Sequence, residues 1–257
     1  MKKIKIGIFG PEGRMGKNII SQIKDYKNFE LSALCEKKGH PSVGKEIKNC
    51  KITDNIESFI KSSDVIIDFS IPQGTLELMK RIKKQKVFLV TGTTGYTKKD
   101  EKNFLEISKG MTILRSFNMS IGINLLKNLA KISSKKIGKI SDIEIFEIHH
   151  NKKKDVPSGT ALSIYDSVNE GLGYKGKPFF REQSSNRPRK KNEIGFSSVR
   201  GGEIIGIHKI YFFLDGEELE LTHIANDRKI FSRGALDAAN WIILKKPGLY
   251  SIIDMLN

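Results

Sequence analysis

From its start to Phe117 the chain alternates short apolar runs with amphipathic stretches, and this rhythm limits the folds that it can adopt. Five apolar runs predict buried strands, at residues 3–9, 29–35, 63–69, 87–91 and 111–114. Three stretches between them carry apolar side chains at helical spacing, at residues 15–26, 75–84 and 98–109. Strands that alternate with helices form a parallel sheet with helices on both faces, so we expect a Rossmann-like, doubly wound α/β domain.

After Asn118 the rhythm changes to a mixture of helices and strands. Helices are predicted at residues 121–137, 161–169 and 233–244. Strands are predicted at residues 142–149, 194–199, 203–213 and 217–225, with a hairpin turn at Asp215-Gly216. Residues 171–192 are rich in Gly, Pro, Ser and charge, which is typical of a loop. The second part of the chain is therefore expected to be an α+β domain.

A glycine-rich segment, GPEGRMG at residues 10–16, lies between the first predicted strand and the first predicted helix. A Rossmann phosphate loop occupies this place, because glycines permit a tight turn and the helix N-terminus offers free N–H groups to a pyrophosphate. The match to G-x-G-x-x-G is imperfect, since Glu12 stands at the second glycine position. A dinucleotide site and a plain glycine turn both fit this segment.

Two further features favour a dinucleotide site. Glu36 ends the second predicted strand, where an acid can accept hydrogen bonds from the ribose of NAD, although Lys37 and Lys38 beside it could pair with the 2′-phosphate of NADP. Residues 91–95, TGTTG, directly follow a buried strand, and their hydroxyls and bare backbone suit a nicotinamide ribose or amide. The alternatives are a solvated loop at Glu36 and a simple turn at residues 91–95.

Residues 147–161, EIHHNKKKDVPSGTA, are the most informative segment. Neighbouring side chains of a strand face opposite ways, so His149 and His150 can reach one site only if the strand ends there. Asp155 or Ser158 is expected to cap the following helix. The free N–H groups at that helix start would then form an anion site suited to a carboxylate. The amides concerned are those of Ser158, Gly159 and Thr160.

An imidazole and an ammonium beside such a site indicate acid–base chemistry on an acidic substrate. Each part also has a simpler interpretation: a structural histidine, a charged loop, or an ordinary helix cap. One acid–base site explains the whole segment, whereas the simple interpretations require three separate explanations within one short stretch. We therefore favour the site.

The formal net charge of +16 could indicate nucleic-acid binding, or a field that concentrates anionic ligands. The lysines are scattered along the chain and no aromatic residues are interleaved with them in a stacking motif, so we favour a compositional origin and expect no nucleic-acid partner. Cys35 and Cys50 form no C-x-x-C pair, and the five histidines lack partners at ligand spacing, so free thiols and no metal are expected. No apolar run is long enough to cross a membrane, and without an export signal the expected location is cytoplasmic.

Taken together, these motifs resemble those of the 4-hydroxy-tetrahydrodipicolinate reductase (dihydrodipicolinate reductase) family of lysine and diaminopimelate biosynthesis. The family signature E-x-H-H-x-x-K-x-D-x-P-S-G-T-A matches residues 147–161 at every fixed position. Further matches are G-R-M-G at 13–16, D-F-S-x-P at 68–72, G-T-T-G at 92–95, R-x-G-x-x-x-G-x-H at 200–208 and G-A-x-x-A-A-x-W at 234–241. The family stretch P-N-F-S-x-G-x-N corresponds to residues 117–124, where Phe117 and Met119 replace the usual Pro and Phe.

The resemblance implies NADH- or NADPH-dependent reduction of 4-hydroxy-tetrahydrodipicolinate, a small dicarboxylate, to tetrahydrodipicolinate with loss of water. It implies His149 as the catalytic acid–base residue and Lys153 as the proton donor. The substrate carboxylates would be bound by His150, Lys153, Ser158, Gly159 and Thr160. The coenzyme would be bound by Gly10, Pro11, Glu12, Gly13, Arg14, Met15, Glu36, Lys37, Gly92, Thr93, Thr94, Ser116, Phe117, Asn118 and Met119.

The resemblance also implies the domain organisation. Residues 1–119 would form the dinucleotide-binding domain, with residues 228–257 returning to it. Residues 120–227 would form a substrate-binding and oligomerisation domain with a mixed sheet, through which family members assemble as homotetramers.

Overall fold

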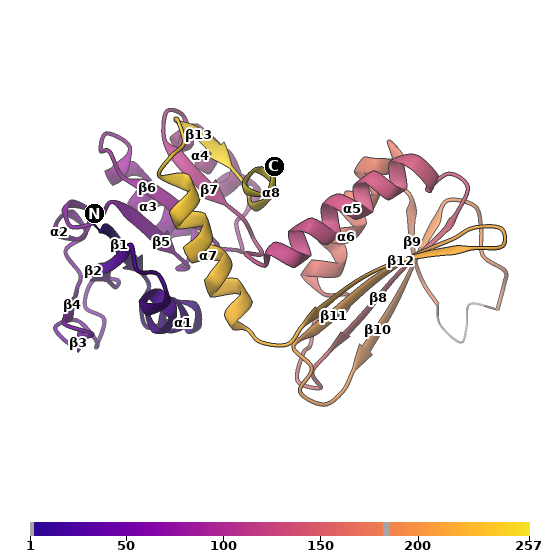
Figure 1. Cartoon of the computed structure of the whole chain (residues 1–257), viewed down its shortest axis with the longest axis horizontal. Helices are drawn as coiled ribbons and strands as arrows, with labels where there is room; N and C mark the ends of the chain where they lie inside the picture. Colours follow the sequence, from indigo (N-terminus) through magenta and orange to yellow (C-terminus); the bar gives the residue numbers. More distant parts are fainter. Residues whose placement is uncertain (1–2, 182–185) are drawn as a thin grey trace. The chain divides into compact units, whose positions relative to one another are not determined.

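The protein divides into two compact units. One comprises the chain up to Ser120 together with Lys229–Asn257, and the other comprises Ile121–Arg228 (Figure 1). The computed structural model describes residues 3–181 and 186–257.

The first unit contains an eight-stranded sheet in the order β13-β7-β6-β5-β1-β2-β4-β3. Its pairs are parallel except that β3 runs antiparallel to β4. Strand order reverses at β1, which lies between β5 and β2, and ligands of doubly wound sheets bind at the carboxyl ends of the strands beside such a point. The strands are β1 Ile4–Phe9, β2 Phe29–Cys35, β3 Glu46–Ile47, β4 Cys50–Thr53, β5 Val65–Asp68, β6 Phe88–Thr91, β7 Thr112–Arg115 and β13 Gly248–Tyr250.

Helices cover both faces of this sheet, as its uninterrupted apolar strands require. On one face Ile6 and Ile8 of β1 share a core with Ile19 of α1 and Leu236 of α7. On the other face Ile66 of β5 packs with residues of α2, α3 and α4. The helices are α1 Arg14–Gln22 with a 3-10 turn at Ile23–Asp25, α2 Ile56–Lys61, α3 Pro72–Ile82, α4 Lys98–Ser108, α7 Lys229–Ile242 and α8 Ile252–Leu256.

The glycine loop joins β1 to α1, and two of its glycines are required by the backbone. Gly10 has a φ of +80°, a left-handed conformation that residues with a side chain rarely adopt. A Cβ on Gly16 would lie 2.4 Å from the carbonyl oxygen of Gly10, so only glycine lets the helix pass this close to the loop. The loop therefore has the tight turn and the close helix approach of a dinucleotide-binding segment.

The second unit contains a five-stranded mixed sheet in the order β12-β11-β8-β10-β9. Strands β8, β10 and β9 are parallel, whereas β11 runs antiparallel to both β8 and β12. Helices α5 and α6 run in the same direction, side by side over one face (Figure 1), and share a core with Ile145 and Ile210. The elements are α5 Ile121–Ile137, β8 Asp142–His149, α6 Gly159–Leu172, β9 Lys177–Phe180, β10 Glu193–Arg200, β11 Gly206–Phe213 and β12 Glu218–Ala225.

The predicted fold class is confirmed, and three predicted elements have the observed bounds: β2, α5 and β8. The predicted loop at residues 171–192 is wrong in part, because Lys177–Phe180 forms β9 and pairs with β10. Residues 182–185 of that loop lie outside the described residues. Helix α7 begins at Lys229 rather than at the predicted residue 233. Elements β3, β4, α2, β13 and α8 were not predicted.

Candidate active site

Strand β8 is the central strand of the mixed sheet, and its carboxyl end gathers polar side chains on the helix-covered face. Ser198 of β10 and His208 of β11 both stand opposite Glu147 in the register. Arg200 stands opposite His149, the last residue of β8. Side chains opposite each other in a sheet share a face, so this register brings together residues that are about 50 positions apart in the sequence.

Glu147 is the most buried of these groups, with 1% of its surface exposed. Its Oε1 accepts hydrogen bonds from the backbone N–H of Ser158 (3.0 Å), from Ser198 Oγ (2.8 Å) and from Arg200 (2.8 Å). Burial would raise the pKa of this carboxyl, but the hydrogen bonds from Ser158, Arg200 and Ser198 outweigh it and hold the pKa below its usual value. The group is therefore a carboxylate at neutral pH.

Two buried imidazoles lie beside the other oxygen of Glu147. His149 Nδ1 is 3.4 Å and His208 Nε2 is 3.8 Å from Oε2, and the two rings meet edge to face at 5.0 Å. Burial, followed by repulsion from His149, lowers the pKa of His208 to about 3. Burial also lowers the pKa of His149, while the charge of Glu147 opposes this change.

The loop after β8 carries the predicted lysine and the second histidine. Lys153 Nζ lies 2.9 Å from Asp155 Oδ2, and this pairing lowers the pKa of Asp155. His150 follows the end of β8, is half-buried, and accepts the N–H of Lys153 on its carbonyl. The strand thus ends at His149, as the sequence requires if both histidines are to face one site.

Ser158 caps helix α6, one of the two residues predicted for that role, and its Oγ accepts the N–H of Ala161. The prediction that the Ser158 amide is free for an anion is wrong, because this amide donates to Glu147. Gly159 begins the helix, so its N–H has no acceptor within the helix, and space around its Cα is open. The predicted anion site therefore loses the amide of Ser158.

The first unit has a cavity of about 450 Å³ near the carboxyl ends of β5, β6 and β7 and the start of α1. Eight of the predicted coenzyme residues line it: Arg14, Met15, Gly92, Thr93, Thr94, Phe117, Asn118 and Met119. Phe69, Ser70 and Phe231 complete the wall and were not predicted as site residues. Phe69 and Ser70 belong to the D-F-S-x-P motif, whereas nothing in the sequence around Phe231 pointed to a site.

A second buried carboxylate, Asp68, organises the edge of this cavity. Its Oδ2 accepts hydrogen bonds from Thr75, Thr91 and Thr93, and its Oδ1 accepts both the N–H and the hydroxyl of Ser70. The hydroxyls of Thr91 and Thr93 therefore donate to Asp68, while the role of residues 91–95 towards a nicotinamide ribose or amide stays a prediction. The backbone of Gly92 remains, and a Cβ there would collide with the ring of Phe69 at 2.1 Å.

The acid at the end of β2 contacts the glycine loop directly. Glu36 Oε1 accepts the N–H of Glu12 at 3.1 Å, and its Oε2 accepts the N–H of Lys37 at 3.3 Å. Glu12 itself forms an ion pair with Lys17 at 3.0 Å. The glutamate at the second glycine position thus turns its side chain towards helix α1 while its amide ties the loop to β2.

Arg115 explains how Phe117 is accommodated where the family usually has proline. Its guanidinium forms a two-pronged pair with Glu101 (2.8 and 2.6 Å) and lies 4.4 Å from the ring centre of Tyr96 and 4.6 Å from that of Phe117. The Phe117 side chain remains 60% exposed at the cavity, whereas Met119 is buried in the core. Stacking on a cation thus positions an exposed aromatic ring.

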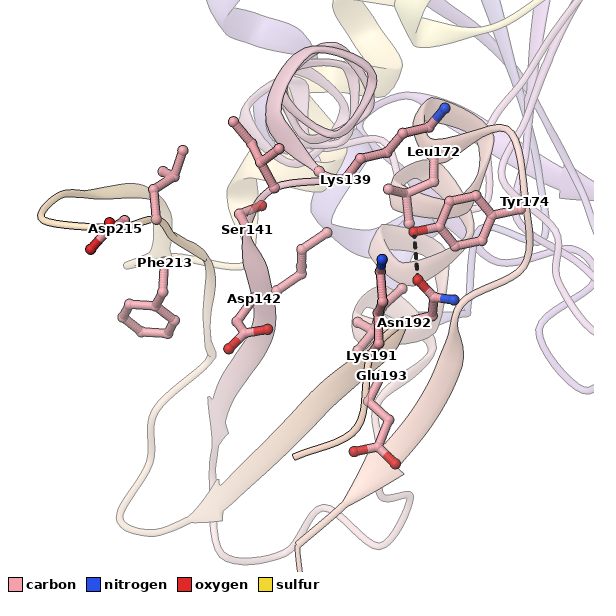
Figure 2. A pocket seen from close by; sticks show the side chains of 15 residues that line it. Lys139, Ser141, Asp142, Leu172, Tyr174, Lys191, Asn192, Glu193, Phe213 and Asp215 are labelled. Carbon is pink, nitrogen blue, oxygen red and sulfur yellow. Dashed lines mark hydrogen bonds between the residues drawn. The ribbon is translucent and has the colours of Figure 1, made fainter. Parts of the chain in front are cut away.

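Another cavity, of about 420 Å³, lies in the second unit between the ends of several strands (Figure 2). Tyr174 donates a hydrogen bond to Asn192 across it, Glu193 pairs with Arg187, and Asp142 pairs with Arg189. No histidine is among its described lining residues, and its main acidic groups are neutralised internally. It is therefore a weaker candidate for chemistry than the end of β8.

Family models match both parts of the chain. Residues 4–119 match the description "Dihydrodipicolinate reductase, N-terminus", and residues 122–256 match "Dihydrodipicolinate reductase, C-terminus". The chain belongs to the dihydrodipicolinate reductase family. It is accordingly an oxidoreductase of a family that depends on pyridine nucleotides, and the predicted family membership is confirmed.

Relatives in this family align along their whole length. The 4-hydroxy-tetrahydrodipicolinate reductase of Pelagibacter ubique is 45% identical over 262 residues, covering 100% of this chain and 99% of the relative. That of Buchnera aphidicola subsp. Baizongia pistaciae is 41% identical and covers 100% of both chains. A dipicolinate-bound dihydrodipicolinate reductase structure from Paenisporosarcina sp. TG-14 superposes with a TM-score of 0.83 at 24% identity, covering 99% of this chain and 100% of that one, which supports the fold.

Among the described residues, Glu147, His149 and His208 form a group that could hold a metal ion, since their ligand atoms lie within 4.8 Å of one another. Their surroundings oppose a divalent cation, because Arg200 already bonds to Glu147 and the charge of Lys153 reaches His149. A family member that transfers hydride from a nicotinamide needs no Lewis acid at this position. The expectation that the protein needs no metal stays a prediction.

Dialysis against a strong chelator should therefore leave activity and melting temperature unchanged. The measurement is elemental analysis of the purified protein, together with the reductase rate before and after chelation. Stoichiometric zinc, or a rate that falls on chelation and returns with added zinc, would contradict this expectation.

Proposed function

We propose that the chain reduces 4-hydroxy-tetrahydrodipicolinate to tetrahydrodipicolinate in diaminopimelate and lysine biosynthesis. One hydride and one proton are consumed, and the substrate's hydroxyl oxygen leaves as water, so the reaction balances. NADH or NADPH, when bound, supplies the hydride. The chain's own groups bind the dicarboxylate, orient it and supply the proton.

One observation carries this proposal: the end of β8 combines a buried imidazole, a lysine and a helix start within 15 residues of sequence, 147–161. His149 acts as the acid–base group, since an imidazole exchanges protons near neutral pH. Lys153 donates a proton, and its pairing with Asp155 holds the ammonium in place before substrate binds.

The dicarboxylate is proposed to bind through complementary charge and through the backbone at the start of α6. The N–H of Gly159 and the backbone of Thr160 at the start of α6 receive one carboxylate, in the positive end of the helix dipole. His150 and Lys153 lie in the loop just before this helix and contribute positive charge for the second carboxylate. The hydroxyl of Ser158 stays with its own helix as the cap.

The first unit is proposed to bind the coenzyme, and the second unit the substrate. The pyrophosphate lies against the loop Gly10, Pro11, Glu12, Gly13 and the start of α1. The nicotinamide half occupies the cavity lined by Gly92, Thr94 and Phe117, while Ser116 supports that wall through its hydrogen bond to the carbonyl of Asn118. The adenosine half lies towards Glu36 and Lys37 at the end of β2.

The coupled reaction tests the function. Purified protein supplied with pyruvate, aspartate semialdehyde and the preceding synthase should oxidise NADH or NADPH, followed as loss of absorbance. Replacement His149→Gln keeps a polar side chain of similar reach but removes the acid, so kcat should fall by about 10²- to 10⁴-fold.

His40→Gln is the matched control, because His40 lies in the loop after β2 and its imidazole has one hydrogen bond among the described residues, accepted on Nδ1 from the N–H of Ser42. Folded wild-type protein without oxidation above background would refute the function. A His149→Gln rate close to wild type would remove His149 from the acid–base role and leave the function open to another donor.

Coenzyme choice depends on two opposed features at one strand end. Glu36 can accept a ribose hydroxyl of NADH with the lone pairs that Glu12 and Lys37 leave unused, whereas Lys37 and Lys38 attract the 2′-phosphate of NADPH. We expect both coenzymes to be used, with kcat/KM values that differ by less than about a thousandfold, roughly 4 kcal/mol.

Steady-state kinetics with each coenzyme provides the ratio. Glu36→Gln should lower kcat/KM for NADH more than for NADPH, and Lys37→Ala should do the reverse. A ratio above a thousandfold in the wild type would show that one of the two features dominates.

A homotetramer is proposed, assembled through the open face of the mixed sheet. The helices cover the face that carries Ile145 and Ile210, so alternate residues point the other way. On that open face Val199, Ile148, Ile207 and Ile224 form one continuous cross-strand row, with 43% of Val199 and 53% of Ile224 exposed. An apolar row of this kind on a sheet face is typical of an interface.

Light scattering after size-exclusion chromatography should give four times the 29.0 kDa chain mass. Ile224→Glu should shift the protein to smaller species, because it places a charge in the apolar row. Leu244→Glu is the control, since Leu244 is 82% exposed and lies in the other unit. A monomeric wild type would contradict the assembly.

We propose a cytoplasmic location, which suits an enzyme whose relatives are named as biosynthetic reductases. None of the helices in the described residues is long and apolar enough to cross a membrane. We infer a small dicarboxylate as the substrate, and the charged lysines require no nucleic-acid partner to explain them.

A further inference from the structure

The carboxylate of Glu147 has one oxygen that is fully engaged and one that is not. Three donors converge on Oε1, whereas Oε2 has no hydrogen bond to any described residue. A buried carboxylate oxygen without a partner is costly, so such an oxygen calls for an explanation. The groups that face it are His149 Nδ1 at 3.4 Å and His208 Nε2 at 3.8 Å.

The facing nitrogen of His149 is also without a partner. Its Nδ1 is buried and has no hydrogen bond among the described residues, although only 7% of the residue is exposed. The carboxylate oxygen of Glu147 and the ring nitrogen of His149 are therefore complementary hydrogen-bonding groups that face each other. The separation of 3.4 Å is longer than a mature hydrogen bond, and contacts in ligand-free sites commonly shorten when substrate binds.

We infer that Glu147 is the positioning residue of His149: it keeps a proton on Nδ1 and leaves Nε2 to exchange a proton with the substrate. The inference rests on the proposed acid–base role of His149. A carboxylate on one ring nitrogen sets the tautomer of an imidazole and stabilises its protonated form, and this arrangement activates the opposite nitrogen.

The opposite nitrogen lies beside a glycine. A Cβ on Gly206 would come within 3.2 Å of His149 Nε2, closer than nearly all side-chain contacts. The absence of a side chain at residue 206 therefore leaves room next to the nitrogen that must meet the substrate. Gly206 begins β11 and does not have a left-handed φ, so the requirement is for space rather than for backbone freedom.

His208 does not compete for the carboxylate. Burial lowers its pKa to about 3, so it stays neutral, and its Nε2 lies 3.4 Å from the Oγ of Ser158. A neutral ring packed edge to face against His149 restricts that ring without adding a second positive charge. The exchangeable proton of the cluster thus belongs to His149.

Charged groups from strand β8, from the loop after it and from β10 set the protonation of His149. Glu147 from the same strand and Asp155 from the following loop raise its pKa, whereas burial, Lys153 of that loop and Arg200 of β10 lower it. His208 of β11 faces it as a neutral ring. Among these groups Glu147 makes the largest favourable contribution to the protonated form, so its removal must lower the pKa of His149.

Glu147→Gln tests the inference, since it keeps the shape and removes the charge. We expect kcat at neutral pH to fall by about 100-fold or more, with KM for the dicarboxylate changed by less than about threefold. The alkaline limb of the pH profile of kcat should move to lower pH, because an acid of lower pKa loses its proton earlier. Glu147→Asp, which restores the charge on a shorter side chain, should return the limb towards its wild-type position.

Glu144→Gln is the matched control on the same strand. Glu144 points to the opposite face of the sheet and pairs with Arg189, so its replacement should leave the pH profile in place. An unmoved limb in Glu147→Gln, or a change confined to KM, would overturn the inference and limit Glu147 to holding the start of α6.

A measurement on the wild type covers the case in which Glu147→Gln does not fold. In protein labelled with ¹⁵N at its five histidines, His149, identified by its absence in His149→Gln, should carry its neutral-state proton on Nδ1. A proton on Nε2 would overturn the inference. A His149→Gln enzyme with normal turnover would instead refute the proposed role of His149, so the two failures are distinguishable.

Discussion

The buried carboxylate of Glu147 is the contact on which the end of the mixed sheet depends. It joins β8 to β10 through Ser198 and Arg200, and it joins both strands to helix α6 through the amide of Ser158. Removing one partner of such a network leaves the others buried without a counterpart, which costs far more than a surface interaction. The same group faces His149, so the fold of the second unit and the surroundings of the proposed acid–base residue depend on one side chain.

Asp68 in the first unit and Glu147 in the second are both buried carboxylates near the end of a strand. They differ in whether both of their oxygens have hydrogen-bond partners. Both oxygens of Asp68 accept hydrogen bonds, Oδ2 from the hydroxyls of Thr75, Thr91 and Thr93 and Oδ1 from Ser70. This carboxylate therefore stabilises the loops at the cavity. Glu147 is equally buried but has an oxygen to spare, directed at two imidazoles. An unsatisfied buried atom is tolerated where it serves a reaction.

Much of this could be predicted from the sequence, because the patterns involved are local. Long periodic elements such as α5 and β8 were predicted with their observed bounds, and the contiguous segment 147–161 marked His149, Lys153 and Gly159 as candidates. Elements of two to six residues, such as β3, β13 and α2, carry too few side chains to show a period. The cluster of Glu147, Arg200 and His208 depends on strand register, which sets neighbours across 50 residues and has no local signature. The orientation of Thr93 likewise depends on Asp68, on another strand.

The residues around Asn118 differ from the family motif in the position of their aromatic ring. The usual motif places its aromatic ring after the asparagine, but here Met119 is buried in the core and the ring belongs to Phe117 before it. An exposed ring with no support would be mobile, and Arg115 supplies the support by stacking against it while Glu101 fixes the guanidinium. The ring thus lines the cavity of the first unit, and the ion pair that holds its cationic support, Arg115 with Glu101, lies within the same unit.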